Sequence, residues 1–108
     1  MEAGVIDVCN FDASWSGGST NWLRMAALAH VYGVQLAHHE GPHVAAHLLA
    51  SQPNSTYPEV FHPDRDPVWW NVVLNRPDVR DGEMCVPSGP GFDSDLDWDF
   101  VRHHRVDG

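Results

Sequence analysis

Short apolar runs alternate with longer amphipathic stretches over residues 1–61. Residues 5–10, 34–37 and 56–61 are rich in β-branched and other apolar side chains, which is typical of strands. Between them, apolar residues recur at three- and four-residue intervals over 20–32 and 43–51, which predicts two helices. The order strand–helix–strand–helix–strand, with short connections, favours parallel strands joined by right-handed crossovers.

Turn-forming residues mark the ends of these elements. Thr20 is a candidate N-cap for the first helix, and Gly33 is a candidate for the left-handed residue that follows it. Pro42 suits the first turn of the second helix. Further along, Asp81-Gly82 is a typical two-residue hairpin turn.

The remaining residues, 62–108, show weaker periodicity. They predict a short helix over 66–75, a hairpin, and final helical turns over 95–104. Three parallel strands and two helices would leave sheet edges open and sheet faces uncovered. We therefore predict an α/β fold in which residues 1–61 are part of a larger sheet, and residues 62–108 form a tail that completes the same domain.

Composition narrows the function classes. The formal charge is −9, from 6 basic and 15 acidic residues, which argues against a nucleic-acid surface because such surfaces need clustered Lys and Arg. No apolar run approaches the roughly 18 residues of a membrane span, and no stretch resembles a signal peptide. Cys9 and Cys85 form no CxxC pair, so we expect two reduced thiols in a cytoplasmic protein.

Candidate catalytic residues accompany each predicted strand. Asp12 follows the first strand, His39 ends the second, and Glu59 lies in the third. In a parallel barrel the carboxyl ends of the strands meet at one active site. His suits proton transfer near neutral pH, and a neighbouring carboxylate would fix its tautomer. Strand ends are also polar simply because they meet solvent, so each residue taken singly leaves a structural interpretation open.

Three further residues are candidates for substrate contact. Asn10 lies two residues before Asp12 and so on the same strand face. Trp15 lies in the loop beyond Asp12, and His38 directly precedes His39.

Two more histidines repeat at helical spacing. His43 and His47 are four residues apart, a spacing that can bind zinc, but no third ligand is evident. We predict no metal site in this chain, and expect His47 to pack in the helix interface and His43 to be exposed.

Several segments together resemble the mandelate racemase subgroup of the enolase superfamily (the mandelate racemase / muconate lactonizing enzyme family). In the segment around the sixth barrel strand of that subgroup, an Asp precedes a Gly-Gly-x-Thr helix start by five residues, as Asp12 precedes Gly17 here. Residues 32–39 are similar to the seventh strand, which ends in the general acid/base His. Residues 46–59 resemble the next helix and the eighth strand. Asp81-Gly82, and the Pro-rich residues after it, resemble the closing segment.

The resemblance implies an α/β fold that is the C-terminal portion of a (β/α)-barrel, about its last three strands and two helices, plus an extended C-terminal tail. Residues 1–61 would be its last βαβαβ. It also implies a Mg-dependent enzyme that abstracts the α-proton of a carboxylate, and we favour a sugar-acid dehydratase over a 2-hydroxy-acid racemase or epimerase. His39 would exchange the proton, Asp12 would hydrogen-bond His39, and Glu59 would contact the substrate's carboxylate or enolate oxygen.

The sequence departs from the family in what it lacks. It contains no Lys, whereas the family uses a Lys-x-Lys pair, and it has no trio of carboxylates on successive strands to hold magnesium. We therefore expect the chain alone to be inactive, and a non-catalytic truncated chain is an alternative. A small His-based metal module is a weaker one. The expected partners are a small carboxylate or sugar-acid substrate, and either further copies of the chain or a missing N-terminal portion.

Overall fold

Three parallel strands form the central sheet of the computed structural model, which describes residues 1–106. They are β1 (Val8–Asn10), β2 (Gln35–His38) and β3 (Ser55–Pro58), in the spatial order β1-β2-β3. Both ladders are parallel, which confirms the predicted direction of the strands. The first and third strands are shorter than expected and leave residues 5–7 and 59–61 outside the sheet.

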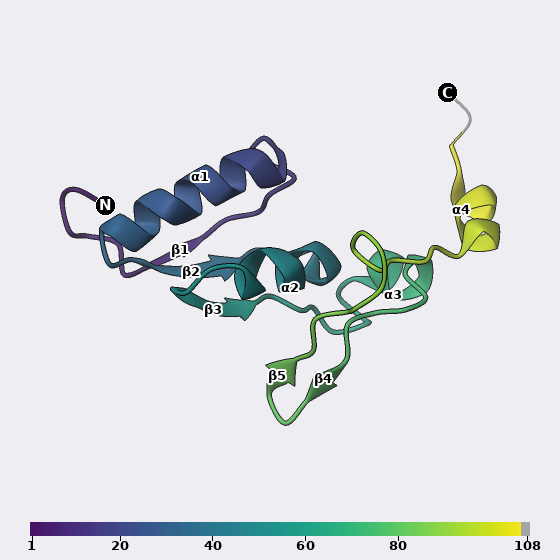
Figure 1. Cartoon of the computed structure of the whole chain (residues 1–108). Helices are drawn as coiled ribbons and strands as arrows, with labels where there is room; N and C mark the ends of the chain where they lie inside the picture. Colours follow the sequence, from purple (N-terminus) through teal and green to yellow (C-terminus); the bar gives the residue numbers. More distant parts are fainter. Residues whose placement is uncertain (107–108) are drawn as a thin grey trace.

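Two helices connect the strands (Figure 1). Helix α1 (Gly18–Val31) joins β1 to β2, and α2 (Pro42–Ala50) joins β2 to β3. Helix α1 begins before Thr20, so the predicted cap is wrong. Its N-cap is Gly17, at φ 84°, with no side-chain cap, because glycine tolerates this left-handed conformation. Pro42 opens α2 as expected.

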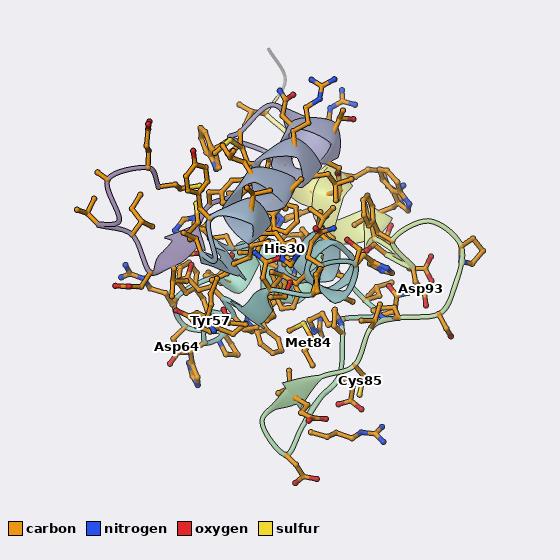
Figure 2. The ribbon with its side chains drawn as sticks, turned by 60° about the vertical axis from the view of Figure 1, so that its left-hand side comes forward. His30, Tyr57, Asp64, Met84, Cys85 and Asp93 are labelled. Carbon is orange, nitrogen blue, oxygen red and sulfur yellow. The ribbon has the colours of Figure 1, made fainter. Side chains whose placement is uncertain are left out.

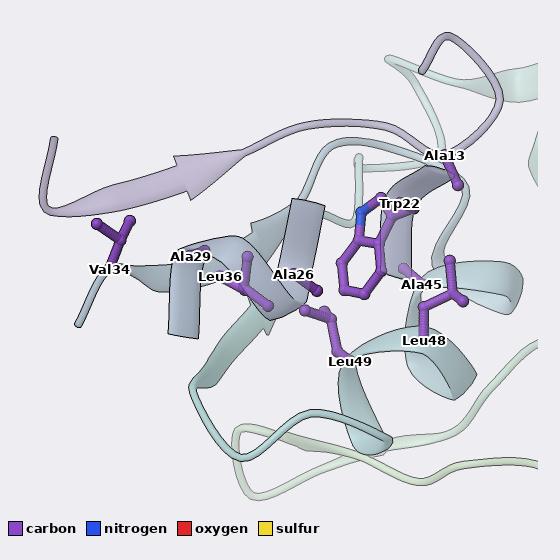
Figure 3. Close-up of a cluster of buried hydrophobic side chains, with 9 residues drawn as sticks. All are labelled: Ala13, Trp22, Ala26, Ala29, Val34, Leu36, Ala45, Leu48 and Leu49. Carbon is purple, nitrogen blue, oxygen red and sulfur yellow. The ribbon is translucent and has the colours of Figure 1, made fainter. Parts of the chain in front are cut away.

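The buried core lies between the helices and one face of the sheet (Figure 3). Trp22 of α1 and Leu36 of β2 are fully enclosed, and Leu49 of α2 packs in the same cluster. Side chains alternate between the two faces of a strand. Leu36 and His38 therefore face the helices, whereas Ala37 faces the other side.

The same alternation orients β1. Cys9 is paired with Leu36 and packs against the core, and Asn10 is paired with Ala37. Asn10 is exposed. The face of the sheet opposite the helices is therefore the one to which Asn10 and Ala37 belong.

The tail adds small elements beyond β3. They are α3 (Pro67–Val72), β4 (Val79–Arg80), β5 (Glu83–Met84) and α4 (Trp98–His104). The β4–β5 hairpin projects away from the three-stranded sheet (Figure 1), and Figure 2 shows Cys85 beside it, far from His30 on α1. The predicted tail extends to residues 107 and 108, which lie outside the described residues.

Local sequence explains the tail's turns and caps. Asp81 and Gly82 both have positive φ, 52° and 82°, which confirms the predicted hairpin turn and fits type I′. The side chain of Asp66 accepts a hydrogen bond from the Trp69 N–H, and that of Asp97 accepts one from the Phe100 N–H. Each of these bonds satisfies an unpaired donor in the first turn of a helix.

An open groove of about 360 Å³ lies between α2, β3 and the hairpin. Its walls include Leu49, Tyr57 and Met84. Asp12, His39 and Glu59 do not line it, so the groove is separate from the predicted catalytic residues. Within the described residues, no helix is long and apolar enough to cross a membrane.

Candidate functional site

The candidate site lies where the three strands end. Asp12 is two residues beyond β1, His39 directly follows β2, and Glu59 directly follows β3. The expectation that Glu59 lies inside the third strand is therefore wrong by one residue. Its backbone N–H still donates to the His38 carbonyl oxygen at 2.9 Å, which fixes the end of β3 beside the end of β2.

His39 faces Glu59 across this junction. The His39 Nε2 atom is 3.5 Å from Glu59 Oε2, and the two side chains are 45% and 32% exposed. The same Glu59 oxygen accepts a hydrogen bond from the Glu40 N–H at 3.3 Å. A half-exposed imidazole beside a held carboxylate can both exchange protons with a ligand and keep its orientation.

Asp12 is buried and is held by its own loop. Its Oδ1 atom accepts hydrogen bonds from the N–H and the hydroxyl of Ser14, and a longer one, 3.4 Å, from the Trp15 N–H. Within the described residues no hydrogen bond joins Asp12 to His39, so the structure does not contain the hydrogen bond expected from the resemblance. The two groups are nevertheless close, because potential ligand atoms of Asp12, His39 and Glu40 all lie within 4.8 Å of one another.

Glu40 is a site residue that sequence reasoning missed. It has a positive φ of 53°, as does Gly41 after it. Left-handed backbone is costly for a residue other than Gly, and such strain gathers at functional sites. The turn brings the Glu40 carboxylate beside Asp12 and His39. The only sequence signal was its position between the His doublet and Gly41-Pro42.

His38 differs most from its expected role. The side chain was a candidate for substrate contact, but it is 1% exposed. Its Nε2 atom accepts a hydrogen bond from the Ala13 N–H at 3.2 Å, and Nδ1 lies 3.0 and 3.1 Å from the carbonyl oxygens of His39 and Glu40. The ring therefore presents no free polar atom to a substrate. It shares the helix-facing side of β2 with Leu36, which explains its burial.

Asn10 and Trp15 are both open to solvent. Asn10 is exposed on the face opposite the helices, and Trp15 is 85% exposed in the loop that follows Asp12. Both side chains are available to a ligand that approaches the strand ends. Their role as substrate contacts remains a prediction.

The helical histidines do not behave as expected. His43, predicted to be exposed, is half-buried, and its Nδ1 accepts a hydrogen bond from the Trp69 indole N–H at 2.9 Å. Burial, and secondarily His47, lower the pKa of His43. His47 packs edge-on against Phe92, with ring centroids 5.6 Å apart. Both rings therefore attach the tail to α2.

The residues at the strand ends do not fit magnesium. In the described part of the chain, one group of three potential metal ligands is present, formed by Asp12, His39 and Glu40. Magnesium takes an octahedral shell of oxygen atoms, whereas this group includes an imidazole, and Asp12 Oδ1 already accepts several hydrogen bonds. A magnesium ion is thus not assigned to these residues.

Residues 1–100 match the family model described as enolase C-terminal domain-like. The chain belongs to this enolase C-terminal domain-like family. The three-stranded sheet and its connecting helices are thus part of the C-terminal domain of an enolase-superfamily fold, as the resemblance implied.

Solved structures agree with this membership in the enolase C-terminal domain-like family. A mandelate racemase/muconate lactonizing enzyme from a marine actinobacterium, crystallised in complex with magnesium, is 57% identical, with a TM-score of 0.92. The match covers 98% of this chain and 30% of that one. L-Talarate dehydratase from a Polaromonas species, complexed with magnesium and L-glucarate, is 31% identical, with a TM-score of 0.79 over 93% of this chain and 26% of that one.

Curated relatives of this enolase C-terminal domain-like chain include two sugar-acid dehydratases. D-Xylonate dehydratase from Haloferax volcanii is 30% identical over 114 aligned positions, covering 100% of this chain and 27% of that protein. L-Rhamnonate dehydratase from Saccharopolyspora erythraea is 28% identical over 97 positions, covering 85% of this chain and 25% of that protein. The chain therefore spans about a quarter of the length of these curated relatives.

Proposed function

We propose that this chain supplies the acid/base half of a sugar-acid dehydratase site, with His39 as the proton-transfer group. The observation that carries the proposal is the half-exposed His39 imidazole among the carboxylates of Asp12, Glu40 and Glu59, at the ends of adjacent parallel strands. The ends of parallel strands are where barrel enzymes place their chemistry.

The proposed reaction removes water from a sugar acid. A base from a segment of the barrel outside this chain would take the hydrogen on the carbon next to the carboxylate as a proton, and the hydroxyl on the following carbon would leave as water once it is protonated. The resulting enol rearranges to a 2-keto acid. His39 would protonate the departing hydroxyl, and the Glu59 carboxylate, 3.5 Å from its Nε2 atom, would hold the ring in position.

Charge limits what the chain can do alone. The site gathers carboxylates, and the sequence contains no Lys, so a substrate carboxylate and a developing enolate would meet negative charge. Developing negative charge needs fixed positive groups near it. We expect these groups to come from segments of an enolase-type barrel outside this chain, and we expect the chain alone to show no turnover.

A 2-hydroxy-acid racemase is the second candidate. It is favoured by a racemase from Streptomyces coelicolor, which is 30% identical over 97% of this chain, with a TM-score of 0.82. In that reaction His39 would deliver a proton to, or remove it from, the carbon next to the carboxylate, and no water would leave. The same imidazole serves both reactions.

A graft tests the proposal. The corresponding segment of the marine actinobacterium enzyme would be replaced by this chain, since the two are 57% identical over 98% of it. The graft and the parent would be assayed on a panel of sugar acids. Formation of a keto acid reports dehydration, and deuterium uptake into recovered hydroxy acid in D₂O reports racemisation. We expect dehydration by the graft, lowered about 10²- to 10⁴-fold by His39→Ala.

The matched control is His30→Ala, because His30 is an exposed histidine on α1. It should leave the rate unchanged. A folded graft that turns over sugar acids equally well with and without His39 would refute the proposed role. Deuterium exchange without keto acid would favour the racemase instead.

A further inference from the structure

The ring of His38 is bonded at both nitrogens. The Ala13 N–H can only donate, so the His38 Nε2 atom, 3.2 Å away, must accept. A neutral ring then carries its proton on Nδ1, which points to the carbonyl oxygens of His39 and Glu40 at 3.0 and 3.1 Å. One tautomer satisfies every polar atom of the ring, as a side chain that is 1% exposed requires.

The ring's hydrogen bonds reach the backbone beside two of the candidate catalytic residues, Asp12 and His39. Ala13 directly follows Asp12, and the carbonyl of His39 belongs to the acid/base candidate itself. The backbone carbonyl of His38 accepts the Glu59 N–H at 2.9 Å. A single residue thus joins three loops that are far apart in sequence.

Packing holds the ring in place from the other side. The indole of Trp22, itself fully buried, lies tilted against the imidazole with ring centroids 5.7 Å apart. Trp22 also donates from its indole N–H to the Phe11 carbonyl oxygen at 3.2 Å, so it anchors the segment that leads to Asp12. The His38 ring therefore has little freedom to rotate, and its hydrogen bonds transmit the position of one loop to another.

We propose that His38 is a positioning residue for the reaction, a neutral Nδ1–H imidazole that holds the Asp12 loop against the His39–Glu40 turn. The expected effect of His38 on the rate rests on the proposed function, whereas its hydrogen bonds between the two loops do not. Loss of the ring would let the Asp12 loop move relative to His39, and misplacement by about 1 Å can cost about a hundredfold in rate. Substrate contact plays no part in this role.

The test compares His38→Leu with His38→Gln. Leu keeps an apolar filling but leaves the buried Ala13 N–H unpaired, whereas Gln can offer an oxygen near the place of Nε2. We expect His38→Leu to lower kcat of the graft about ten- to a hundredfold, with KM changed less than about twofold. His38→Gln should recover most of the loss. Amide hydrogen exchange at Ala13, in the full chain and in the graft, should rise about tenfold in the Leu variant only.

A spectroscopic measurement separates this proposal from the proposed function. Long-range ¹⁵N–¹H spectra of ¹⁵N-His-labelled protein should show His38 as the Nδ1–H tautomer, whether or not the protein has activity. An Nε2–H tautomer, an unchanged kcat in a folded His38→Leu variant, or equal impairment of the Gln and Leu variants would overturn the positioning role. If the Leu variant fails to fold, the Gln variant and the tautomer still decide. A graft that is inactive on all substrates would count against the proposed function. The tautomer of His38 and the hydrogen exchange of the Ala13 amide would still test whether His38 holds the Asp12 loop.

Discussion

At the scale of single residues, Trp22 shows how much one enclosed side chain contributes. Its side chain is fully buried, packs in the core, stacks on Phe11 with centroids 5.3 Å apart, and donates to a carbonyl. Replacing a buried Trp by Ala removes apolar burial and leaves a cavity. We expect Trp22→Ala to lower the free energy of unfolding by about 3–5 kcal/mol, measured by urea denaturation.

Trp15 provides the matched control for that measurement. It is the same residue type but is 85% exposed, so Trp15→Ala should change stability by no more than about 0.5 kcal/mol. If Trp22→Ala were equally mild, the enclosed position of the indole between α1, β2 and α2 would be wrong.

At the scale of elements, the contact between α2 and α3 should depend on pH. Burial lowers the pKa of His43, and the Trp69 indole N–H donates to its Nδ1. The unfolded chain therefore binds more protons than the folded one as pH falls below about 6.5, the ordinary His value. Stability should be flat above that pH, fall through the window down to the lowered folded pKa, and level off beneath it.

Paired variants isolate this effect from the other histidines. Urea midpoints of wild type and His43→Gln would be compared between pH 8 and pH 5, at roughly half-unit steps around the ordinary His value. The difference between the two urea midpoints should shrink on acidification, because protonation of His43 destabilises only the wild-type fold. His30→Gln, at an exposed histidine on α1, is the control variant and is measured over the same pH range. Identical curves for wild type and His43→Gln would contradict the assigned contact.

Elements also show which features could be predicted from sequence. Short apolar, β-branched runs predicted β1 to β3, and apolar residues at helical spacing predicted both crossover helices, because the core draws on residues of β2 and of both helices. Asp81-Gly82 found the hairpin because few residues tolerate two positive φ values. The burial of His38 could also have been read from its position two residues after Leu36. The left-handed Glu40 could not, because tertiary contacts and not its side chain select that conformation.

The candidate site was predictable as a set of residues but not as a set of contacts. Asp12, His39 and Glu59 follow three neighbouring strands, and parallel strands bring such residues together. Which carboxylate faces His39 depends on loop geometry that spacing does not encode. The ring lies 3.5 Å from Glu59, whereas Asp12 Oδ1 is bonded to Ser14 and Trp15.

At the scale of the whole molecule, the three-stranded sheet has two edges with which no strand of residues 1–106 pairs. Strands β1 and β3 are the outer strands of the three-stranded sheet, and exposed apolar side chains lie along them, including Val8 at 37% and Tyr57 at 56%. Open edges invite pairing with other chains. We expect the isolated chain to self-associate or partly unfold in dilute solution, as measured by sedimentation velocity and thermal melting.

The converse result would be equally clear. A monomer at all concentrations with a sharp two-state melt would mean that the edges are already protected. The marine actinobacterium enzyme, taken whole, is the comparison protein, and we expect no such concentration dependence of its melting.

The alternation of side chains between the two faces of β2 has a consequence for insertions that precede this strand. One extra residue inserted ahead of β2 would shift its register by one and exchange the two faces. His38 would then occupy the place of His39, while Ala37 would occupy the place of His38. The doublet would still place an imidazole at the His39 position after such an insertion, but it would lose the buried ring that bonds to the Ala13 N–H. An insertion at this point should therefore keep a histidine beside Glu59 and release the Asp12 loop from the end of β2.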